Sequence, residues 1–246
     1  MTPVTPRPTA GATPFITDVA AWARQALDAI ANEISSDDRA LLESQVAALA
    51  KATPSATPPP PDPTAATVVR DINTLKKVAA QLKDAPEVAI DLETSSLDPR
   101  IGEIVGIGLS ASNVNFYFPI AHRCEVRKSL LADQLPVDAV VKVLCLDRLP
   151  LIAHNAKFEF RWLRRHAGVT CKFIWDTMVA ARLRASHLPA DLKDLAMREL
   201  DVPDWSLDKA GIKNVQFLSI ERVARYCAKD CRYTLELYRR QRECML

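Results

Sequence analysis

The chain has 246 residues, of which 48% are hydrophobic and 25% are charged, and its formal net charge is +2 at pH 7. This composition is typical of a globular protein with one sizeable core, and no apolar run approaches the roughly 20 residues that a membrane span requires. The six cysteines form no C-x-x-C pair, which argues against a zinc site and a disulfide framework, and the N-terminus has no apolar signal core, so we expect a cytoplasmic protein without contact with a membrane.

Residues 1–66 differ in composition from the rest of the chain, because they contain ten of the 17 prolines and have a net charge of −3, against +5 for the remainder. We interpret 1–14 as a disordered tail and the proline-rich 53–66 as an extended linker. Between them, 15–52 contains two amphipathic stretches, which predict a small helical hairpin. Such a hairpin is too small to bury its own apolar faces, so we expect it to dock on a partner, and a self-contained tail without a role is the alternative.

From residue 67 onward, the pattern changes to alternating strands and helices. The first helix is expected over 73–82, with Asn73 as its N-cap. Three strands joined by short links follow, and they predict a meander. We expect these strands at 87–93, 103–110 and 113–120, later strands at 151–155 and 173–175, and later helices at 136–145, 157–167, 176–186, 191–200 and 221–243. This order predicts an α/β fold in which helices flank a mixed sheet.

Two carboxylates interrupt the buried strand pattern of the segment VAIDLET, residues 88–94. Because side chains alternate along a strand, Asp91 and Glu93 lie on one face and Leu92 lies on the other. Two like charges held this close repel each other, and their burial is costly without a counter-charge. The pair therefore indicates a site for a cation.

Further acids occur where a mixed sheet can bring them near this strand. Glu159 follows the strand 151–155 at the start of a helix, and Tyr226 and Asp230 are four residues apart on one face of the last helix. Four converging carboxylates require cations, and hard oxygen ligands suit Mg²⁺ or Mn²⁺ rather than zinc. Two such ions about 3.5–4 Å apart stabilise the attacking and leaving oxygens of a phosphoryl displacement. Each motif alone is common, so the prediction depends on their order and context.

Three segments in this order resemble the DEDD superfamily of 3′–5′ exonucleases in its tyrosine-bearing subgroup. VAIDLETSSLDP is similar to the first exonuclease motif, AHNAKFEFRWL to the second and YCAKD to the third. The likeness is closest to the proofreading domain of family A DNA polymerases, the DNA polymerase I type, and it covers residues 67–246. It implies a ribonuclease H-like fold that hydrolyses DNA from a single-stranded 3′ end with two divalent ions, Mg²⁺ or Mn²⁺.

The resemblance also implies a role for individual residues of the site. Catalysis and metal binding would involve Asp91, Glu93, Glu159 and Asp230, the attacking water would be oriented by Tyr226, and the substrate strand would contact Leu92, Thr94, Asn155 and Phe158. Other polar residues nearby have simpler interpretations. Asp176 is expected as the N-cap of its helix, and Arg161, Arg164 and Arg165 are expected either to contact phosphates or to form a solvated helix face.

Two features depart from the family pattern. Glu159 stands where the family usually has Asp, which moves the carboxylate one methylene further out, so Mn²⁺ is expected to be the better cofactor. The chain also ends directly after the helix of the third motif, so it is either cut from a longer polymerase or a free-standing exonuclease. In the second case, 15–52 would dock on a separate DNA polymerase or on another copy of this chain.

Two alternatives to the proofreading exonuclease stay open. The first keeps the chemistry and changes the substrate, as in an RNA-trimming exoribonuclease like ribonuclease D, because no residue in the sequence reads the 2′-hydroxyl directly. The second is an inactive exonuclease fold that serves as a nucleic-acid-binding or polymerase-docking module. Glu159 favours this second alternative, whereas the presence of Tyr226 and of all four carboxylates argues against it.

Overall fold

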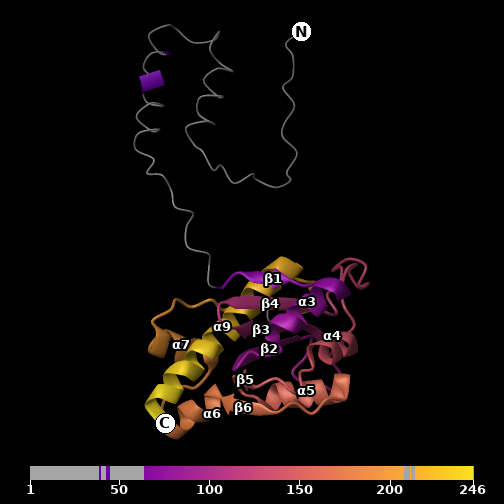
Figure 1. The fold of residues 1–246 in the computed structure, drawn as a ribbon. Coiled ribbons are helices and arrows are strands. Elements are labelled where there is room, and N and C mark those ends of the chain that lie inside the picture. Colours follow the sequence, from indigo (N-terminus) through magenta and orange to yellow (C-terminus); the bar gives the residue numbers. More distant parts are fainter. Residues whose placement is uncertain (1–38, 40–42, 45–63, 208–210, 212–213, 246) are drawn as a thin grey trace, which may run out of the picture. The chain divides into compact units, whose positions relative to one another are not determined.

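The computed structural model describes residues 64–207 and 214–245, together with Arg39, Glu43, Ser44 and Gly211. The expected tail 1–14, almost all of the expected hairpin 15–52 and the expected linker as far as residue 63 lie outside the described residues, so these interpretations stay predictions. The chain divides into two units, Met1–Pro60 and Pro61–Leu246, and the second contains the folded elements labelled in Figure 1.

Among the described residues of the second unit, six strands form one mixed sheet with the order β1-β4-β3-β2-β5-β6 (Figure 1). The strands β2, β3 and β4 pair antiparallel as the expected meander, whereas the pairs β1–β4, β2–β5 and β5–β6 are parallel. The strand bounds are β1 Ala66–Val68, β2 Val88–Thr94, β3 Ile104–Ala111, β4 Val114–Pro119, β5 Leu151–Ala153 and β6 Phe173–Asp176. The expected α/β class with a mixed sheet is confirmed.

The short edge strand β1 has no counterpart in the sequence-based expectation, which began the domain at residue 67. Ala66–Val68 pairs in parallel with residues 115–117 of β4, and the side-chain amide of Asn115 donates to the carbonyl of Ala65 at 3.0 Å. Three residues that follow a proline-rich segment are too short to show a strand period. Their extended conformation depends on a partner strand almost fifty residues away.

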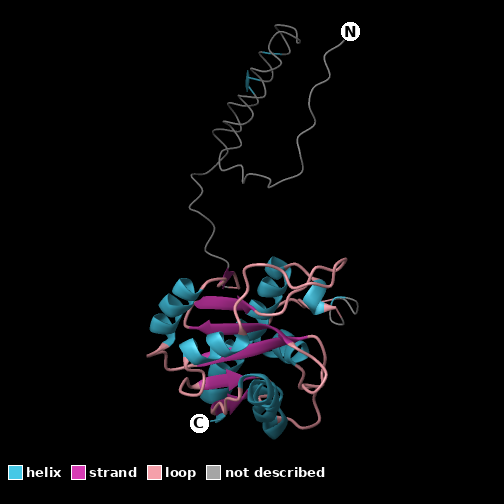
Figure 2. Cartoon of the chain, turned by 90° about the vertical axis from the view of Figure 1, so that its right-hand side faces the viewer, coloured by secondary structure: helices cyan, strands magenta, loops and turns pink. Residues whose placement is uncertain are grey.

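Helices cover both faces of the sheet (Figure 2). The helices α3, α4 and α5 pack with one core cluster, α9 packs against the opposite face, and α6 and α7 form a third cluster with α9. The bounds are α3 Ile72–Leu82, α4 Val137–Leu144, α5 Lys157–Ala167, α6 Thr177–Arg184, α7 Leu192–Leu200, the 3-10 turn η1 Val215–Phe217 and α9 Ile220–Met245. Within the described ranges, no helix has both the length and the apolar composition of a membrane span.

Two of these helices test the expected N-caps. The expectation for Asn73 is wrong, because the carboxylate of Asp71 caps α3 and accepts hydrogen bonds from the main-chain N–H groups of Asn73 and Thr74 at 2.9 Å each. Asn73 therefore lies inside the helix, where its N–H is one of the groups that need a cap. The expectation for Asp176 is confirmed, because its carboxylate accepts from two N–H groups in the first turn of α6.

The long helix α9 approaches the sheet closely at Gly108 of β3. A Cβ atom at this position would lie 2.4 Å from Sγ of Cys227 and 2.8 Å from Sγ of Cys231, so glycine leaves the room that the two buried thiols occupy. Gly108 is also the register partner of Asp91 in β2. The contact therefore brings residues 226–230 of α9 beside Asp91.

Candidate functional site

The candidate site lies where the end of β2 faces α9. β2 is a central strand, paired with β3 on one side and with β5 on the other, so its position is well defined. Asp91 and Glu93 lie on the face that α9 covers, whereas Leu92 belongs to the core cluster of the opposite face, as the alternation predicts. The strand register shifts between Glu93 and Thr94, so the regular ladder ends directly after the two acids.

Burial and mutual repulsion disfavour the charged forms of these acids. Burial, followed by the charge of Asp230, raises the pKa of Asp91 to about 7. Burial and the charge of Asp91 raise the pKa of Glu93 well above its usual value. The same two causes raise the pKa of Glu159, which is only 3% exposed. The carboxylates therefore cannot all be ionised near neutral pH unless cations enter the site.

The oxygen atoms of the site fit a hard divalent cation. Oε1 of Glu93 and Oε2 of Glu159 are buried and have no hydrogen-bond partner, which is unusual for carboxylate oxygens in a protein interior. Oxygen donors of this kind are what Mg²⁺ and Mn²⁺ prefer. The two unpartnered acceptors therefore fit the divalent metals that the sequence predicts. The ligand atoms that lie within 4.8 Å of one another are those of Asp91, Glu93 and Cys227, and Glu159 and Asp230 do not belong to this group.

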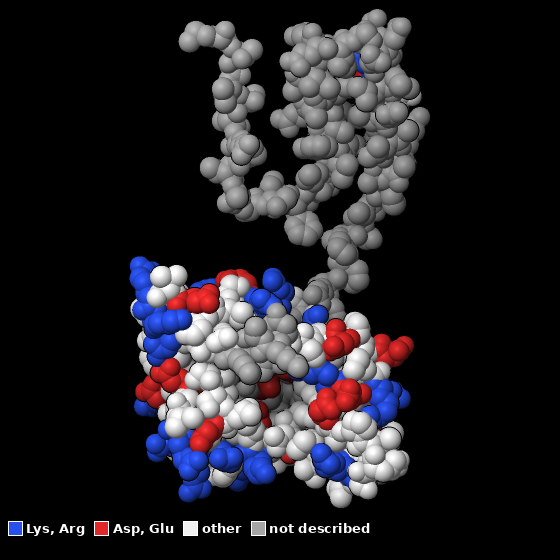
Figure 3. All heavy atoms as spheres, turned by 180° about the vertical axis from the view of Figure 1, so that it is seen from behind, with Lys and Arg blue, Asp and Glu red and all other residues white. Residues whose placement is uncertain are grey.

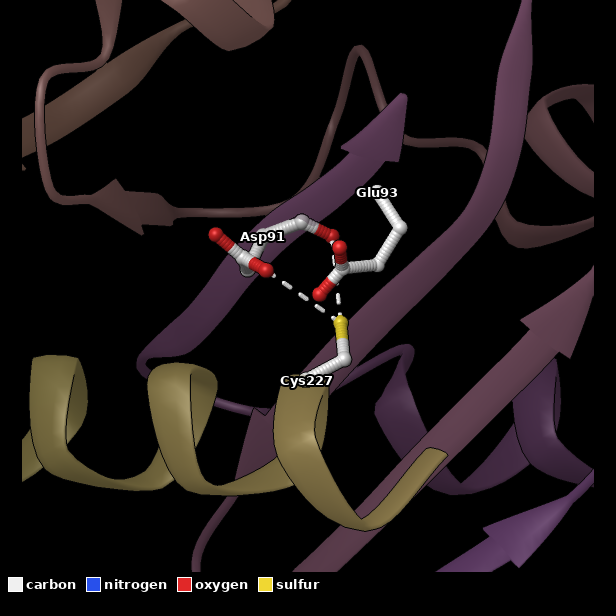
Figure 4. Close-up of side chains that lie close together, drawn as sticks. All are labelled: Asp91, Glu93 and Cys227. Carbon is white, nitrogen blue, oxygen red and sulfur yellow. Dashed lines mark hydrogen bonds between the residues drawn. The ribbon is translucent and has the colours of Figure 1, made fainter. Parts of the chain in front are cut away.

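Cys227 belongs to this site as well, although no local sequence pattern marks it as a ligand or a positioning residue. Its thiol donates to Oδ2 of Asp91 with a distance of 3.3 Å, and the ligand atoms of Asp91, Glu93 and Cys227 all lie within 4.8 Å of one another (Figure 4). Burial raises the pKa of Cys227 well above its usual value. The group is therefore a protonated thiol that positions Asp91, and it is a poor ligand for a hard cation.

Asp230 and Tyr226 lie on the same part of α9 and share one cationic partner, Lys193 of α7. Nζ of Lys193 donates to Oδ1 and Oδ2 of Asp230 at 2.6 and 2.7 Å and to the hydroxyl oxygen of Tyr226 at 2.9 Å. The indole N–H of Trp205 donates to Oδ1 of Asp230 at 2.5 Å. Burial and the charge of Asp230 raise the pKa of Tyr226, so its phenol is neutral at physiological pH.

Sequence reasoning missed both Lys193 and Trp205. Lys193 lies in the segment DLKDLAMREL, in which it reads as one more charged residue of an amphipathic helix. It is 37 residues from Asp230, and no local spacing rule connects the two segments.

Glu159 enters the site from the first turn of α5, and Asp176 positions the start of that helix. The carboxylate of Asp176 accepts from the main-chain N–H groups of Asn155 at 3.1 Å and Ala156 at 2.8 Å, in addition to capping α6. Asn155 has a φ of 69°, a left-handed conformation that asparagine tolerates better than most residues. One carboxylate thus joins the turn between β5 and α5 to the start of α6, and the substrate role expected for Asn155 stays a prediction.

A cavity of about 500 Å³ opens beside Glu93, and its volume is within the size range of small-molecule sites. Its lining includes three of the four residues expected to contact substrate, Leu92, Thr94 and Phe158, together with Glu93 and Tyr226. The full lining is Leu92, Glu93, Thr94, Ser95, Ser96, Leu97, Phe158, Leu207, Val215 and Tyr226. Figure 3 shows a hollow on one face of the molecule, with acidic side chains at its base. Asn155 is not part of the lining.

Comparison with solved structures finds the same fold in other nucleases. A nuclease solved in its apo form is 25% identical with a TM-score of 0.51, and the match covers 67% of this chain and 74% of that one. The catalytic core of RRP6 from Trypanosoma brucei is 22% identical with a TM-score of 0.55, over 72% of this chain and 46% of that one. The expected ribonuclease H-like α/β fold is confirmed.

Comparison with characterised proteins and families identifies the chemistry. DNA polymerase I of Chloroflexus aurantiacus is 34% identical over 201 residues, which are 77% of this chain and 20% of that protein, and DNA polymerase I of Synechocystis is 30% identical over 176 residues, or 67% and 17%. The chain therefore spans about a fifth of the length of these relatives. A family model described as 3′–5′ exonuclease matches residues 66–243. The expected resemblance to the proofreading domain of DNA polymerase I is thus confirmed, and the chain belongs to the family of 3′–5′ exonucleases, which hydrolyse phosphodiester bonds and generally use divalent metal ions.

Proposed function

We propose that this chain is a metal-dependent exonuclease that removes nucleotides from the 3′ end of single-stranded DNA and proofreads for a DNA polymerase. The observation that carries the proposal is the group of acids around Asp91, in which Oε1 of Glu93 and Oε2 of Glu159 are buried without a hydrogen-bond partner and Glu93 lines the cavity. Buried acids that repel each other are tolerated where a cation neutralises them.

The metal ligands in this proposal are the four acids Asp91, Glu93, Glu159 and Asp230. When bound, two ions stabilise the attacking and the leaving oxygens of the phosphoryl displacement. The longer side chain of Glu159 favours Mn²⁺ over Mg²⁺, because Mg²⁺ demands near-ideal octahedral geometry. The S–H group of Cys227 holds Asp91 from the side of α9, so that this carboxylate keeps one orientation.

Tyr226 orients the attacking water. Its pKa is raised, so it acts as a neutral hydroxyl that forms hydrogen bonds, and it does not act as a phenolate base. Its oxygen is held by Nζ of Lys193 at 2.9 Å, and its side chain lines the cavity beside Glu93. A fixed hydroxyl in this position places the water for in-line attack at low entropic cost.

The terminal nucleotide binds in the cavity. Phe158, Leu92 and Leu97 supply an apolar wall, against which a base packs without regard to its identity. Thr94 lines the same cavity, and its hydroxyl donates to the carbonyl of Ser96 at 2.8 Å, so it helps to shape the loop around the nucleotide. A site of this kind accepts any of the four bases, as a proofreading nuclease must.

The exposed face of α5 contacts the phosphates of the substrate strand. Arg161, Arg164 and Arg165 line a groove together with Pro99 and Phe160, and α5 is the helix that carries Glu159. Guanidinium groups bind phosphate oxygens without regard to sequence. A strand that leaves the cavity along α5 therefore meets positive charge close to the site.

DNA is the proposed substrate because the two relatives named above, which are at least 30% identical over 77% and 67% of this chain, are DNA polymerases. The ribonuclease-like neighbours are less than 25% identical and inform only on the fold. The polymerase partner, the cytoplasmic location and the docking role of residues 15–52 stay predictions. Deletion of residues 1–60, the first unit, is expected to leave turnover on free oligonucleotides unchanged and to weaken co-purification with a family A polymerase.

Digestion of 5′-labelled oligonucleotides tests the proposal. Single-stranded DNA, a duplex with a mismatched 3′ end and RNA of the same sequence are incubated with Mg²⁺, with Mn²⁺ or with EDTA. We expect a ladder that shortens from the 3′ end on both DNA substrates, faster with Mn²⁺, and no digestion in EDTA. The Asp91→Asn variant serves as the inactive control, and a terminal phosphorothioate linkage confirms the direction of digestion.

Three outcomes of this assay contradict the proposal. Faster digestion of RNA than of DNA would favour the RNA-trimming alternative. Oligonucleotide binding without digestion under any metal condition would favour the inactive binding module. Digestion that persists in EDTA, or in the Asp91→Asn variant, would show that the proposed metal site is not the catalytic one.

A further inference from the structure

Lys193 lies largely shielded from solvent at the edge of the acidic site, where the proposed hydrolysis gives its ammonium group only the hydrogen bond to Tyr226. The exposed fraction of its side chain is 18%, and that of its partner Asp230 is 7%. In the part of the chain that the structure describes, Lys193 is the one cationic side chain within hydrogen-bond distance of any of the four site carboxylates. A lysine that is largely removed from water is costly unless it is paired, and here its partner is itself one of the proposed metal ligands.

The contacts of Lys193 account for all three hydrogens of its ammonium group. Nζ donates to both oxygens of Asp230 and to the hydroxyl of Tyr226, and it lies 5.1 Å from the ring centroid of Trp205 and 4.6 Å from that of Tyr226. Two aromatic faces and three acceptors thus enclose one positive charge. These groups form a specific binding site for a cation, and the ammonium group of Lys193 occupies it.

The same contacts limit how a metal ion reaches Asp230. Each carboxylate oxygen has two lone pairs. Oδ1 already accepts from Lys193 and Trp205, and Oδ2 accepts from Lys193. A metal ion that binds Asp230 therefore meets carboxylate oxygens that already accept three hydrogen bonds, and a positive charge directly beside them. An ion that takes both oxygens must displace Lys193.

We propose that Lys193 is a built-in counter-cation, which holds Asp230 and Tyr226 in place in the metal-free protein and competes with the divalent ion for Asp230. This inference rests on the proposed function, because it takes Asp230 as a metal ligand. In the metal-free state, Lys193 neutralises one of the four repelling acids and keeps α7 and α9 together. In the loaded state, its charge lowers the affinity of the ion at Asp230, so that this ion binds more weakly than the ion at Asp91 and Glu93.

Metal binding to the full chain without substrate tests the inference. Mn²⁺ is titrated into metal-free protein and followed by calorimetry and by the electron paramagnetic resonance of the free ion. Lys193→Met removes the charge and keeps a side chain that packs against Trp205 and Tyr226. We expect the weaker Mn²⁺ dissociation constant to fall at least about tenfold, because a unit charge within hydrogen-bond distance is removed from a poorly screened site.

Two further variants separate the competition from other effects. Lys142→Met removes one exposed lysine from α4, on the opposite face of the sheet, and should change the same constant less than about twofold, because exposed charges are screened over this distance. In an Asp230→Asn background, Lys193→Met should no longer tighten Mn²⁺ binding, because the group for which the two cations compete has lost its charge.

The melting temperature gives a second measurement that does not depend on activity. Lys193→Met should melt at a lower temperature than the wild type in EDTA, and saturating Mn²⁺ should raise its melting temperature by more than it raises that of the wild type. If the methionine variant does not fold without metal, Lys193→Gln replaces it, since the amide still donates to Asp230 without a charge.

Unchanged or weaker Mn²⁺ binding in Lys193→Met, with normal binding in the wild type, would overturn the inference and leave the proposed function intact. The same holds if the Asp230→Asn background does not abolish the effect. A wild-type protein that binds no divalent metal would overturn the proposed function and this inference with it.

Discussion

The close approach of α9 to Gly108 provides a sharp test of how the fold builds the site. A methyl group at this position would lie 2.4 Å from Sγ of Cys227 and 2.8 Å from Sγ of Cys231. Non-bonded heavy atoms in ordinary van der Waals contact are separated by at least about 3.5 Å. In Gly108→Ala, the thiol of Cys227 must therefore move away by about 1 Å. Both cysteines are fully buried, and rotation of Cys227 would break its hydrogen bond to Asp91. We therefore expect α9 itself to shift.

The shift should affect stability and activity together. Overpacking of a well-packed core costs about 1–3 kcal/mol in the free energy of unfolding, which corresponds to a fall of about 2–12 °C in the melting temperature of a domain of this size. Tyr226 and Asp230 lie on the displaced turn of α9, and a misplacement of about 1 Å in a catalytic group can cost about a hundredfold in turnover. Thermal melting and the rate of digestion of single-stranded DNA measure the two effects.

A second substitution should reverse part of the damage. Cys227→Ala removes the sulfur atom that collides with the new methyl group. The free energy of unfolding of the double variant, Gly108→Ala with Cys227→Ala, should therefore exceed the value expected from the sum of the two single changes by about 0.5–3 kcal/mol. Gly168→Ala is the matched control, because a Cβ at Gly168 meets no atom within 4 Å and the cost comes only from its φ of 65°. It should destabilise the protein slightly and leave Mn²⁺ affinity unchanged. Normal turnover and melting in Gly108→Ala, or no rescue by Cys227→Ala, would refute the idea that this contact positions the catalytic turn of α9.

Three further predictions concern the carboxylates. Asp91→Asn should lower exonuclease turnover at least about a thousandfold while the protein stays folded by circular dichroism, because it removes a principal charge and relieves repulsion; near-normal digestion would disprove the assignment. Glu159→Asp should keep or raise the Mg²⁺-dependent rate, whereas Glu159→Ala should lower it at least about a hundredfold; the opposite order would show that residue 159 is not a metal ligand. In EDTA, folded Asp91 holds its proton up to about pH 7 but releases it near pH 3.8 when unfolded, so its contribution to the free energy of unfolding falls as the pH rises between these values. The melting temperature of the wild type should therefore fall, relative to that of Asp91→Asn, from pH 4 to pH 8, and a constant difference between the two would contradict the raised pKa.

Local patterns in the sequence determined much of the fold and part of the site. The period of two in β2 predicts that Asp91 and Glu93 share a face and that Leu92 lies on the other, and the structure confirms it. Asp176 is correctly predicted as a helix cap, because an N-cap contacts groups only two or three residues away. Signals of this kind lie within a few residues of the feature that they predict.

The tertiary structure alone decided the features that join distant segments. β1 becomes a strand by pairing with β4, Asp176 reaches back to the turn before α5, and Gly108 admits Cys227 beside Asp91. The most consequential case is Lys193, which contacts Asp230 although the two residues are 37 positions apart and lie on different helices. Such contacts depend on how α7 and α9 pack on each other and on the sheet, and packing is a property of whole faces that no short stretch of sequence encodes.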